Sequence, residues 1–280
     1  MIYLITNIYC NNNVYNIELR NQELEKIFIK STNKHLTYQV GNFVEVTKLS
    51  GKSTIEKQTN TPENYLDFYK KGTKEYQQLY DELLNYYEKV TIEEYKILLD
   101  ETIFKNLDFF KYPAAKSIHH DYIGGLAEHT LNLLNLSQEL IKMYDLDQDL
   151  LWTGIMLHDY SKLKEMSHFG LTYTVEGNLI GHLVMTVEEI VKVCGKYNIE
   201  NTLEIITLKH LILAHHGKLE YGSAKEPMTK EAYALSQLDE LDAKMNVLQK
   251  AIDQVPDNTM TASILAFDRR RFLNYKKEED

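Results

Sequence analysis

The chain has 280 residues, of which 44% are hydrophobic and 26% are charged, as in ordinary soluble globular proteins. Its formal net charge of −10 disfavours a protein that coats duplex nucleic acid without sequence preference. No apolar run approaches the roughly 18 residues that cross a bilayer, so we expect no membrane partner. The N-terminus has no signal-peptide pattern, and Cys10 and Cys194 lie far apart in the sequence. Both observations predict a cytoplasmic location.

The sequence pattern of the first 61 residues is typical of a small β domain. Short β-prone stretches are separated by turn residues and cover Ile2–Tyr9, Val14–Leu19, Lys26–Lys30 and Tyr38–Leu49. This pattern predicts a small sheet or barrel over residues 1–61, with an OB-like barrel as one candidate and Lys57–Pro62 as a linker.

Aromatic residues accompany lysines throughout this segment, a combination that can bind single strands by stacking and charge. Most aromatic side chains in strands belong to the core, so we expect only one or two to contact bases. The candidates are Tyr3, Tyr9, Tyr15, Phe28, Tyr38 and Phe43.

From residue 62 onward the hydrophobic spacing is helical, which predicts a helical domain over residues 62–280. The expected fold class is therefore mainly α, a helical bundle with a small N-terminal β domain. A capping box at Thr91 predicts one helix start, and Gly217 predicts a helix end. The remaining helices are expected at 63–89, 124–143, 148–164, 176–195, 202–216 and 229–252.

Nine of the ten histidines lie between residues 119 and 216, and this clustering indicates chemistry rather than packing. Several of them have an ordinary structural interpretation. We expect His35 and His168 to be structural and His210 to lie at the surface or behind a site. His119 and His120 precede the Gly124-Gly125 turn and are expected to support a site rather than to act in it.

The other histidines form a pattern with aspartates on several predicted helices. Imidazole and carboxylate together suit Mn, Fe, Zn or Mg, and ligands from separate helices can converge inside a bundle. The absence of thiolates argues against a closed structural zinc site and favours an open catalytic one. The pattern comprises His129, His158-Asp159, His182, His215-His216, and Asp239 and Asp242 at i, i+3.

These residues match a known signature. His129, His158-Asp159 and an aspartate in the last long helix resemble the H…HD…D motif of the HD phosphohydrolase superfamily. Over roughly residues 100–255 the chain resembles, more specifically, the YhaM-type 3′-5′ exoribonucleases of low-GC Gram-positive bacteria. The segments that carry this resemblance are 119–130, 157–162, 181–182, 214–223 and 241–245.

The resemblance implies an OB-fold domain joined to an HD domain, and hydrolysis of single-stranded RNA or DNA from its 3′ end to nucleoside 5′-monophosphates. It also implies two divalent ions per chain, with manganese expected and iron, magnesium, zinc or cobalt as alternatives. The first ion would be held by His129, His158, Asp159 and Asp239, with Asp242 as a rival for Asp239. The second would be held by His182, His215 and His216, with Asp159 as the bridge.

The same resemblance suggests roles for further residues. Asp159 and Lys162 would act in catalysis, with Lys162 contacting a phosphate oxygen. Lys162, Lys218, Tyr221 and Ser223 would bind the strand end. A homo-oligomer is compatible with this interpretation.

Two other functions remain open. An HD phosphohydrolase or phosphodiesterase acting on a small nucleotide would use the same ligands. A non-catalytic single-stranded nucleic-acid-binding protein is disfavoured, because an inactive bundle has no physical reason to keep so many polar groups in its interior.

Overall fold

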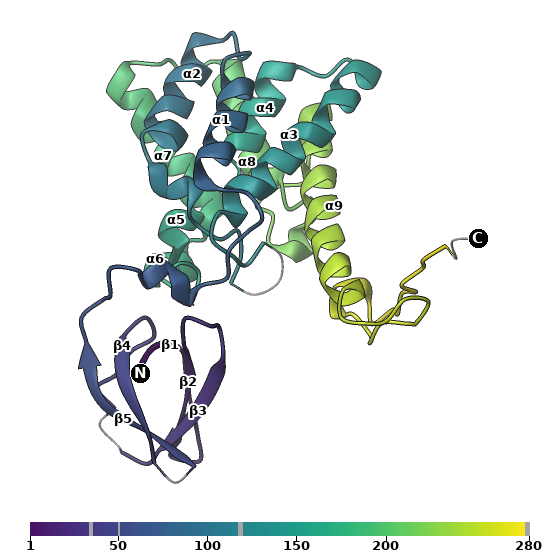
Figure 1. Ribbon diagram of the computed structural model, residues 1–280. Coiled ribbons are helices and arrows are strands. Elements are labelled where there is room, and N and C mark those ends of the chain that lie inside the picture. Colours follow the sequence, from purple (N-terminus) through teal and green to yellow (C-terminus); the bar gives the residue numbers. More distant parts are fainter. Residues whose placement is uncertain (34–35, 50, 117–119, 278–280) are drawn as a thin grey trace.

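The computed structural model describes residues 1–33, 36–49, 51–116 and 120–277. Figure 1 shows a small sheet below a bundle of helices, and an arm that leaves the lower end of α9. The predicted fold class, mainly α with a small N-terminal β domain, is confirmed. No helix in the described ranges is long and apolar enough to cross a membrane.

The N-terminal sheet is antiparallel and, within the described residues, has the strand order β3-β2-β1-β4-β5. One face is buried through Ile5, Ile17 and Val44. Successive side chains of a strand point to opposite faces, and on the other face Leu4 and Phe43 are also buried, in a cluster with Phe68. The identification of this sheet as an OB fold remains a prediction. The strands are β1 (Ile2–Asn11), β2 (Val14–Arg20), β3 (Lys26–Ser31), β4 (Phe43–Leu49) and β5 (Lys52–Thr59).

Two details of the sheet differ from the sequence-based expectation. The expected strand from Tyr38 begins only at Phe43, because Gly41 adopts a φ of +90° and its N–H turns back to donate to the carbonyl of Ile5. The expected linker from Lys57 is partly wrong, since Lys57 pairs with Glu45 at the end of β5. This strand pairs only with β4 in the described structure and carries mostly polar side chains, so its hydrophobic alternation is weak.

The helical body has its core between α3, α4, α8 and α9, where Leu126, Leu151, Leu208 and Leu235 are fully buried. The long helices are α1 (Tyr76–Tyr87), α3 (Gly125–Tyr144), α4 (Gln148–Leu157), α7 (His182–Tyr197), α8 (Leu203–Ala214) and α9 (Lys230–Ile252). The shorter elements are η1 (Tyr65–Phe68), α2 (Glu93–Leu99), η2 (Asp100–Phe104), η3 (Leu107–Phe110), α5 (Lys162–Glu165), β6 (Met166–Ser167), β7 (Thr172–Tyr173), α6 (Val175–Leu179), η4 (Leu219–Tyr221) and η5 (Leu265–Phe267).

Three expected helices are each divided in the structure. The helical pattern over 63–89 contains η1 and α1, and the helix expected over 148–164 is interrupted at residues 158–161. The helix expected over 176–195 is interrupted at Gly181, whose φ of +79° an α-helix does not accept. The last two interruptions lie beside the histidine cluster and determine how it is built.

The predicted capping box at Thr91 is wrong. The first helical residue is Glu93, and the N–H groups of Thr91 and Ile92 donate to Asp149 Oδ2 at 2.7 and 3.0 Å. The Asp149 carboxylate on α4 therefore caps the start of α2. No local sequence motif predicts this long-range contact.

The sheet meets the helical body through the loop between β6 and β7. The ring of Phe169 packs against Tyr65, Tyr69 and Tyr112 with centroid distances of 5.3–5.7 Å. Next to it, the ring of His168 lies so close to Gly41 that a Cβ there would come within 2.3 Å of it.

Candidate metal centre

His129 of α3 and His158 at the end of α4 point their Nε2 atoms at each other at 3.2 Å, and both side chains are fully buried. The Nδ1 atom of His158 lies 2.7 Å from the carbonyl oxygen of Ile155, and Nδ1 of His129 lies 2.7 Å from Asp242 Oδ2. If both Nδ1 atoms carry the proton and donate, both Nε2 atoms present lone pairs to one another. Such an arrangement is repulsive unless a cation or a proton lies between them.

The spacing of these atoms fits a metal ion. Imidazole nitrogens bind divalent metals at about 2.0–2.1 Å, so two ligands of one ion lie about 3.0–3.4 Å apart. Asp239 Oδ1 is 3.2 Å from His129 Nε2, and Asp159 Oδ2 is 3.3 Å from His158 Nε2. The donors of this first group are therefore spaced like the ligands of a single ion.

The adjacent pair His158-Asp159 reaches one centre because the helix ends there. Neighbouring residues in a continuous helix point about 100° apart, but α4 ends at Leu157 and the chain turns before α5. Burial raises the pKa of Asp159, but Lys162, His158 and His182 outweigh it and hold that pKa well below its usual range. The carboxylate is therefore ionised, as a metal ligand must be.

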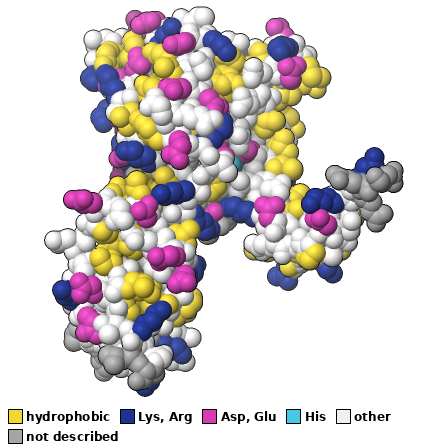
Figure 2. Space-filling view, in the orientation of Figure 1, with side chains coloured by type: hydrophobic (Ala, Val, Ile, Leu, Met, Phe, Trp, Pro, Cys, Tyr) yellow, Lys and Arg dark blue, Asp and Glu magenta, His cyan; other side chains and the backbone are white. Residues whose placement is uncertain are grey.

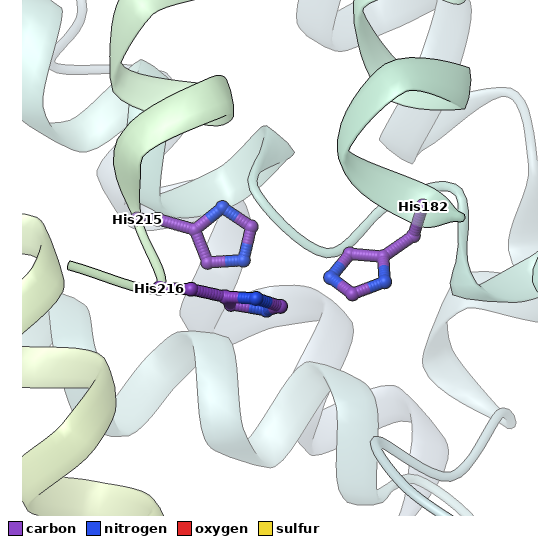
Figure 3. A group of neighbouring side chains, drawn as sticks. All are labelled: His182, His215 and His216. Atoms are coloured by element: carbon purple, nitrogen blue, oxygen red, sulfur yellow. The ribbon is translucent and has the colours of Figure 1, made fainter. Parts of the chain in front are cut away.

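A second group lies on the other side of Asp159. Figure 3 shows His182, from the start of α7, facing the rings of His215 and His216 at the end of α8. Asp159 Oδ1 is 3.3 Å from His182 Nε2 and 3.8 Å from His215 Nε2. Within the described part of the chain, these three buried atoms have no hydrogen-bond partner, and an ion would supply one.

Hydrogen bonds from the opposite ring nitrogens fix these histidines. His182 Nδ1 is 2.8 Å from Glu165 Oε1, and His215 Nδ1 is 2.7 Å from the carbonyl oxygen of Ile212. His216 Nδ1 lies 3.1 Å from the carbonyl oxygen of Tyr221. Such contacts fix the tautomer and aim Nε2 at the metal in known metal sites. Burial and the nearby His158 lower the pKa of His215, which keeps it a neutral ligand.

The comparison with protein families identifies this region. Residues 126–244 match the model of the HD domain, which includes every member of both groups. That region is an HD domain. The chain is also similar to curated proteins of known name. The chain is 47% identical to the 3′-5′ exoribonuclease YhaM of Bacillus pumilus, 46% to that of Bacillus licheniformis and 44% to that of Bacillus subtilis.

Each of these alignments covers 167 residues, which are 59% of this chain and 53% of the relative. The chain thus spans about half the length of the curated relatives it matches. No solved structure matches it. Over the aligned part, the chain is similar to YhaM-type proteins and carries the HD domain, in agreement with the resemblance that the sequence motifs indicate.

Within the HD domain, Asp239 and Asp242 occupy different positions relative to His129. Asp242 accepts from Asn132 at 2.9 Å through Oδ1, and its Oδ2 lies 2.7 Å from both His129 Nδ1 and His120 Nε2. It therefore orients His129 from behind, whereas Asp239 lies on the Nε2 side with the other donors. The geometry favours Asp239 as the ligand. Asp242 is buried because it contacts His129, His120 and Asn132.

The protonation of the His129 ring competes with metal binding at the centre. Burial lowers its pKa, but hydrogen bonds and charge from Asp239 and Asp242 outweigh burial and raise it to about 9. Without an ion, the ring is therefore protonated at neutral pH, and a metal must compete with that proton.

Two of the four residues expected to bind substrate, Lys162 and Tyr221, line an open pocket of about 220 Å³. Lys162, Tyr221, His216 and Asp239 are among its lining residues, and Lys162 Nζ is 2.6 Å from Asp159 Oδ2. Lys218 is exposed at the rim, with its ammonium 5.2 Å from the ring centroid of Tyr221.

Ser223 differs from the other three predicted substrate contacts. Its hydroxyl lies 3.0 Å from the carbonyl of Leu213 and 2.6 Å from that of Lys225, so its one proton is used within the loop. We therefore leave it out of the proposed substrate site.

The sequence interpretation did not identify Glu165 and Asn132, which position His182 and Asp242. A signal for Glu165 existed, because a ligating histidine needs an acceptor for its other nitrogen and Glu165 follows the HD pair by six residues. His120, expected to support the site, contacts Asp242 and Tyr122. His210 accepts from the N–H of Met228 at 2.9 Å, an exposed contact. His35 and His119 lie outside the described residues.

Proposed function

We propose that this chain is a metal-dependent 3′-5′ exonuclease that hydrolyses single-stranded RNA to nucleoside 5′-monophosphates, with single-stranded DNA as a second substrate. One observation carries the proposal. A buried cluster of histidine and aspartate donors lies in an HD domain that is 44–47% identical to proteins named 3′-5′ exoribonuclease.

Two divalent ions fit the donors of the HD domain. The first would be held by His129, His158, Asp159 and Asp239, and the second by His182, His215, His216 and the other oxygen of Asp159. Manganese is the metal that the resemblance to YhaM-type proteins implies, and mixed imidazole and carboxylate ligands are compatible with it, as they are with iron, zinc or magnesium. Such ions stabilise charge on a phosphate and make a water molecule acidic.

The side chains around the ions have separate tasks. Asp159 forms an ion pair with Lys162, which lines the pocket, and the charge of Asp159 raises the pKa of the buried Lys162 against the effect of burial. A lysine that stays protonated can act as a point charge on a non-bridging phosphate oxygen. Lys218 and Tyr221, at the rim, would contact the last nucleotide of the strand.

The N-terminal sheet offers a surface for the rest of the strand. Tyr3 and Phe43 are buried, whereas Tyr9 and Phe28 are 50% and 62% exposed. Tyr9 pairs with Asn16, which pairs with Lys30, two residues from Phe28 on the same strand. Because directly paired residues share a face, Tyr9, Phe28 and Lys30 lie on one exposed face.

We propose that this face stacks bases and contacts phosphates, with residues 1–61 as the strand-binding domain and 62–280 as the hydrolytic one. The exposed face would then hold nucleotides upstream of the one that enters the pocket.

The decisive experiment uses 5′-labelled and 3′-labelled single-stranded RNA and DNA with manganese, with excess chelator and with the His158→Ala variant as controls. We expect 3′-labelled RNA to release labelled mononucleotide 5′-phosphate first, and 5′-labelled RNA to shorten progressively. Internal cuts or products with a 3′-phosphate would contradict the proposal. Hydrolysis of free nucleotides alone would identify a small-nucleotide phosphohydrolase, and binding without cleavage would identify a non-catalytic binding protein.

A further inference from the structure

Arg20, the last residue of β2, carries a buried guanidinium that lacks an acceptor. The residue is 9% exposed, its Nε atom has no hydrogen-bond partner, and it forms no ion pair within the described residues. Burial lowers the pKa of Arg20, yet an arginine stays protonated at neutral pH. Buried polar groups are almost always hydrogen-bonded, and a guanidinium has five N–H donors, so this exception indicates an acceptor from outside the chain.

The neighbours of Arg20 hold its side chain in place. The guanidinium lies over the ring of Tyr69, 5.4 Å from its centroid, where the sheet meets the helical body. Stacking on a ring fixes the plane of a guanidinium and leaves its N–H edge for a ligand. The two carboxylates whose charge reaches Arg20, Glu18 and Asp121, are already bound to lysines at 2.8 and 2.6 Å.

Arg20 lies on the face of the sheet that is proposed above to bind the strand. It pairs directly with Lys26, and Phe28 and Lys30 follow on β3 at intervals of two residues. Directly paired residues share a face, as do residues two apart in a strand. A row of cationic and aromatic side chains therefore runs along β3 and ends beside Arg20.

An open cleft of about 400 Å³ lies at this end of the row. Residues 22–24, which follow β2, line one side of it, and Asp67, Tyr69 and Lys71 of the helical body line the other. Figure 2 shows Lys and Arg side chains gathered where the sheet adjoins the helical body. A strand that follows the row toward the helical body therefore arrives at this cleft, next to the ring on which Arg20 is stacked.

We propose that Arg20 binds one phosphate of the single strand at the contact between the sheet and the helical body, and so holds the strand between the base-binding face and the HD domain. Arginine suits this role because its planar guanidinium can donate two parallel N–H bonds to a phosphate. Burial strengthens such bonds, since the local dielectric constant is low. The inference rests on the proposed single-stranded substrate but not on its hydrolysis.

Binding of fluorescein-labelled single-stranded RNA to the full chain tests the proposal, measured by anisotropy over a range of salt concentrations in excess chelator, which prevents hydrolysis. Arg20→Gln should weaken binding about tenfold or more. It should also reduce the slope of log affinity against log salt by about 0.7, the contribution of one phosphate on a single strand. Lys142→Gln, which removes an exposed charge on α3, is the control and should keep both values.

Oligonucleotides with a single methylphosphonate linkage locate the contact. A neutral linkage at the bound phosphate should weaken binding to the wild type, whereas Arg20→Gln should lose nothing further at that position. Equal sensitivity of both proteins at every position, or wild-type affinity and salt slope in Arg20→Gln, would show that Arg20 only stacks on Tyr69. If Arg20→Gln does not fold, Arg20→Lys replaces it. Lysine keeps the charge but not the paired donors, so binding should weaken several-fold with an unchanged salt slope, and wild-type affinity would overturn the proposal.

Inorganic phosphate distinguishes a strand from a free anion as the ligand. If phosphate raises the Tm of the wild type but not of Arg20→Gln, while the variant binds RNA normally, Arg20 belongs to a free-phosphate site and the proposal is overturned. A chain that binds RNA through Arg20 but releases no mononucleotide with manganese would contradict the proposed exonuclease and support this inference.

Discussion

Replacing Asp242 and Asp239 separately by asparagine distinguishes a positioning residue from a ligand on the same helix. Asp242 lies on the Nδ1 side of His129 with His120 and Asn132 as further partners, whereas Asp239 lies on the Nε2 side with the other donors. Asparagine keeps the shape of the side chain but removes its charge. We therefore expect Asp242→Asn to weaken metal binding and Asp239→Asn to abolish the first site.

The expected loss of metal affinity in each variant follows from the contacts that the replaced carboxylate makes. Hydrogen bonds to charged groups contribute about 1.5–3 kcal/mol, and loss of a residue that orients a ligand costs about 10–100-fold in metal affinity or activity. An amide oxygen can still accept from His129, so Asp242→Asn should fall within this range. Asp239→Asn removes a direct donor, so its activity should be lost rather than reduced.

The assay is manganese titration by calorimetry together with hydrolysis of a bis-nitrophenyl phosphate ester and of labelled RNA. Asp253→Asn, at the C-terminal end of the same helix, is the control and should behave like the wild type. An inactive Asp242→Asn variant, together with an Asp239→Asn variant that retains a tenth or more of the wild-type rate, would contradict the assignment of Asp239 as the ligand.

Three further predictions concern the HD pair, pH and the sheet. His158→Ala and Asp159→Ala should lower hydrolysis of the small ester by orders of magnitude with unchanged far-UV circular dichroism, whereas His168→Ala should leave it intact; equal losses in all three would refute our assignment. In chelator, the folded-state pKa of His129 near 9 lies above its ordinary 6.5, so its contribution to the free energy of unfolding is complete below pH 6.5 and is lost as pH rises through 9. Denaturant titrations should show a loss of up to about 3 kcal/mol over that window, and His129→Gln should remove this dependence. Tyr9→Ala with Phe28→Ala should raise KM for an oligonucleotide but not for the ester, and an equal rise for both would show that the sheet does not bind the strand.

The grouping of these side chains was predictable because it depends on residue types and on helix ends. The structure brings together His129, His158, Asp159, His182, His215 and His216, and their role as metal ligands stays a prediction. The preference for Asp239 over Asp242 came from the resemblance alone, because residues three apart share a helix face and the spacing does not separate them. The structure shows that Asp239 lies beside Nε2 of His129 and that Asp242 lies beside Nδ1.

The positions of most helices followed from their hydrophobic period, whereas interruptions and long-range caps did not. The helix expected over 148–164 keeps its apolar spacing across the interruption at residues 158–161, so periodicity cannot reveal it. Asp149 caps α2 from 57 residues away, a contact set by packing and not by local sequence. The strand β5 was missed because its side chains are mostly polar.

The close contact between Gly41 and His168 has a consequence for how the two parts of the chain can change. Any side chain at Gly41 would displace the His168 ring, and Gly41 also holds a backbone conformation that other residues rarely adopt. His168 follows Glu165 by three residues, and Glu165 fixes His182 in the metal centre. A single methyl group added at Gly41 would thus displace the loop that carries Glu165 and could shift His182 in the HD domain. We therefore expect few substitutions to be tolerated at this contact between the sheet and the helical body.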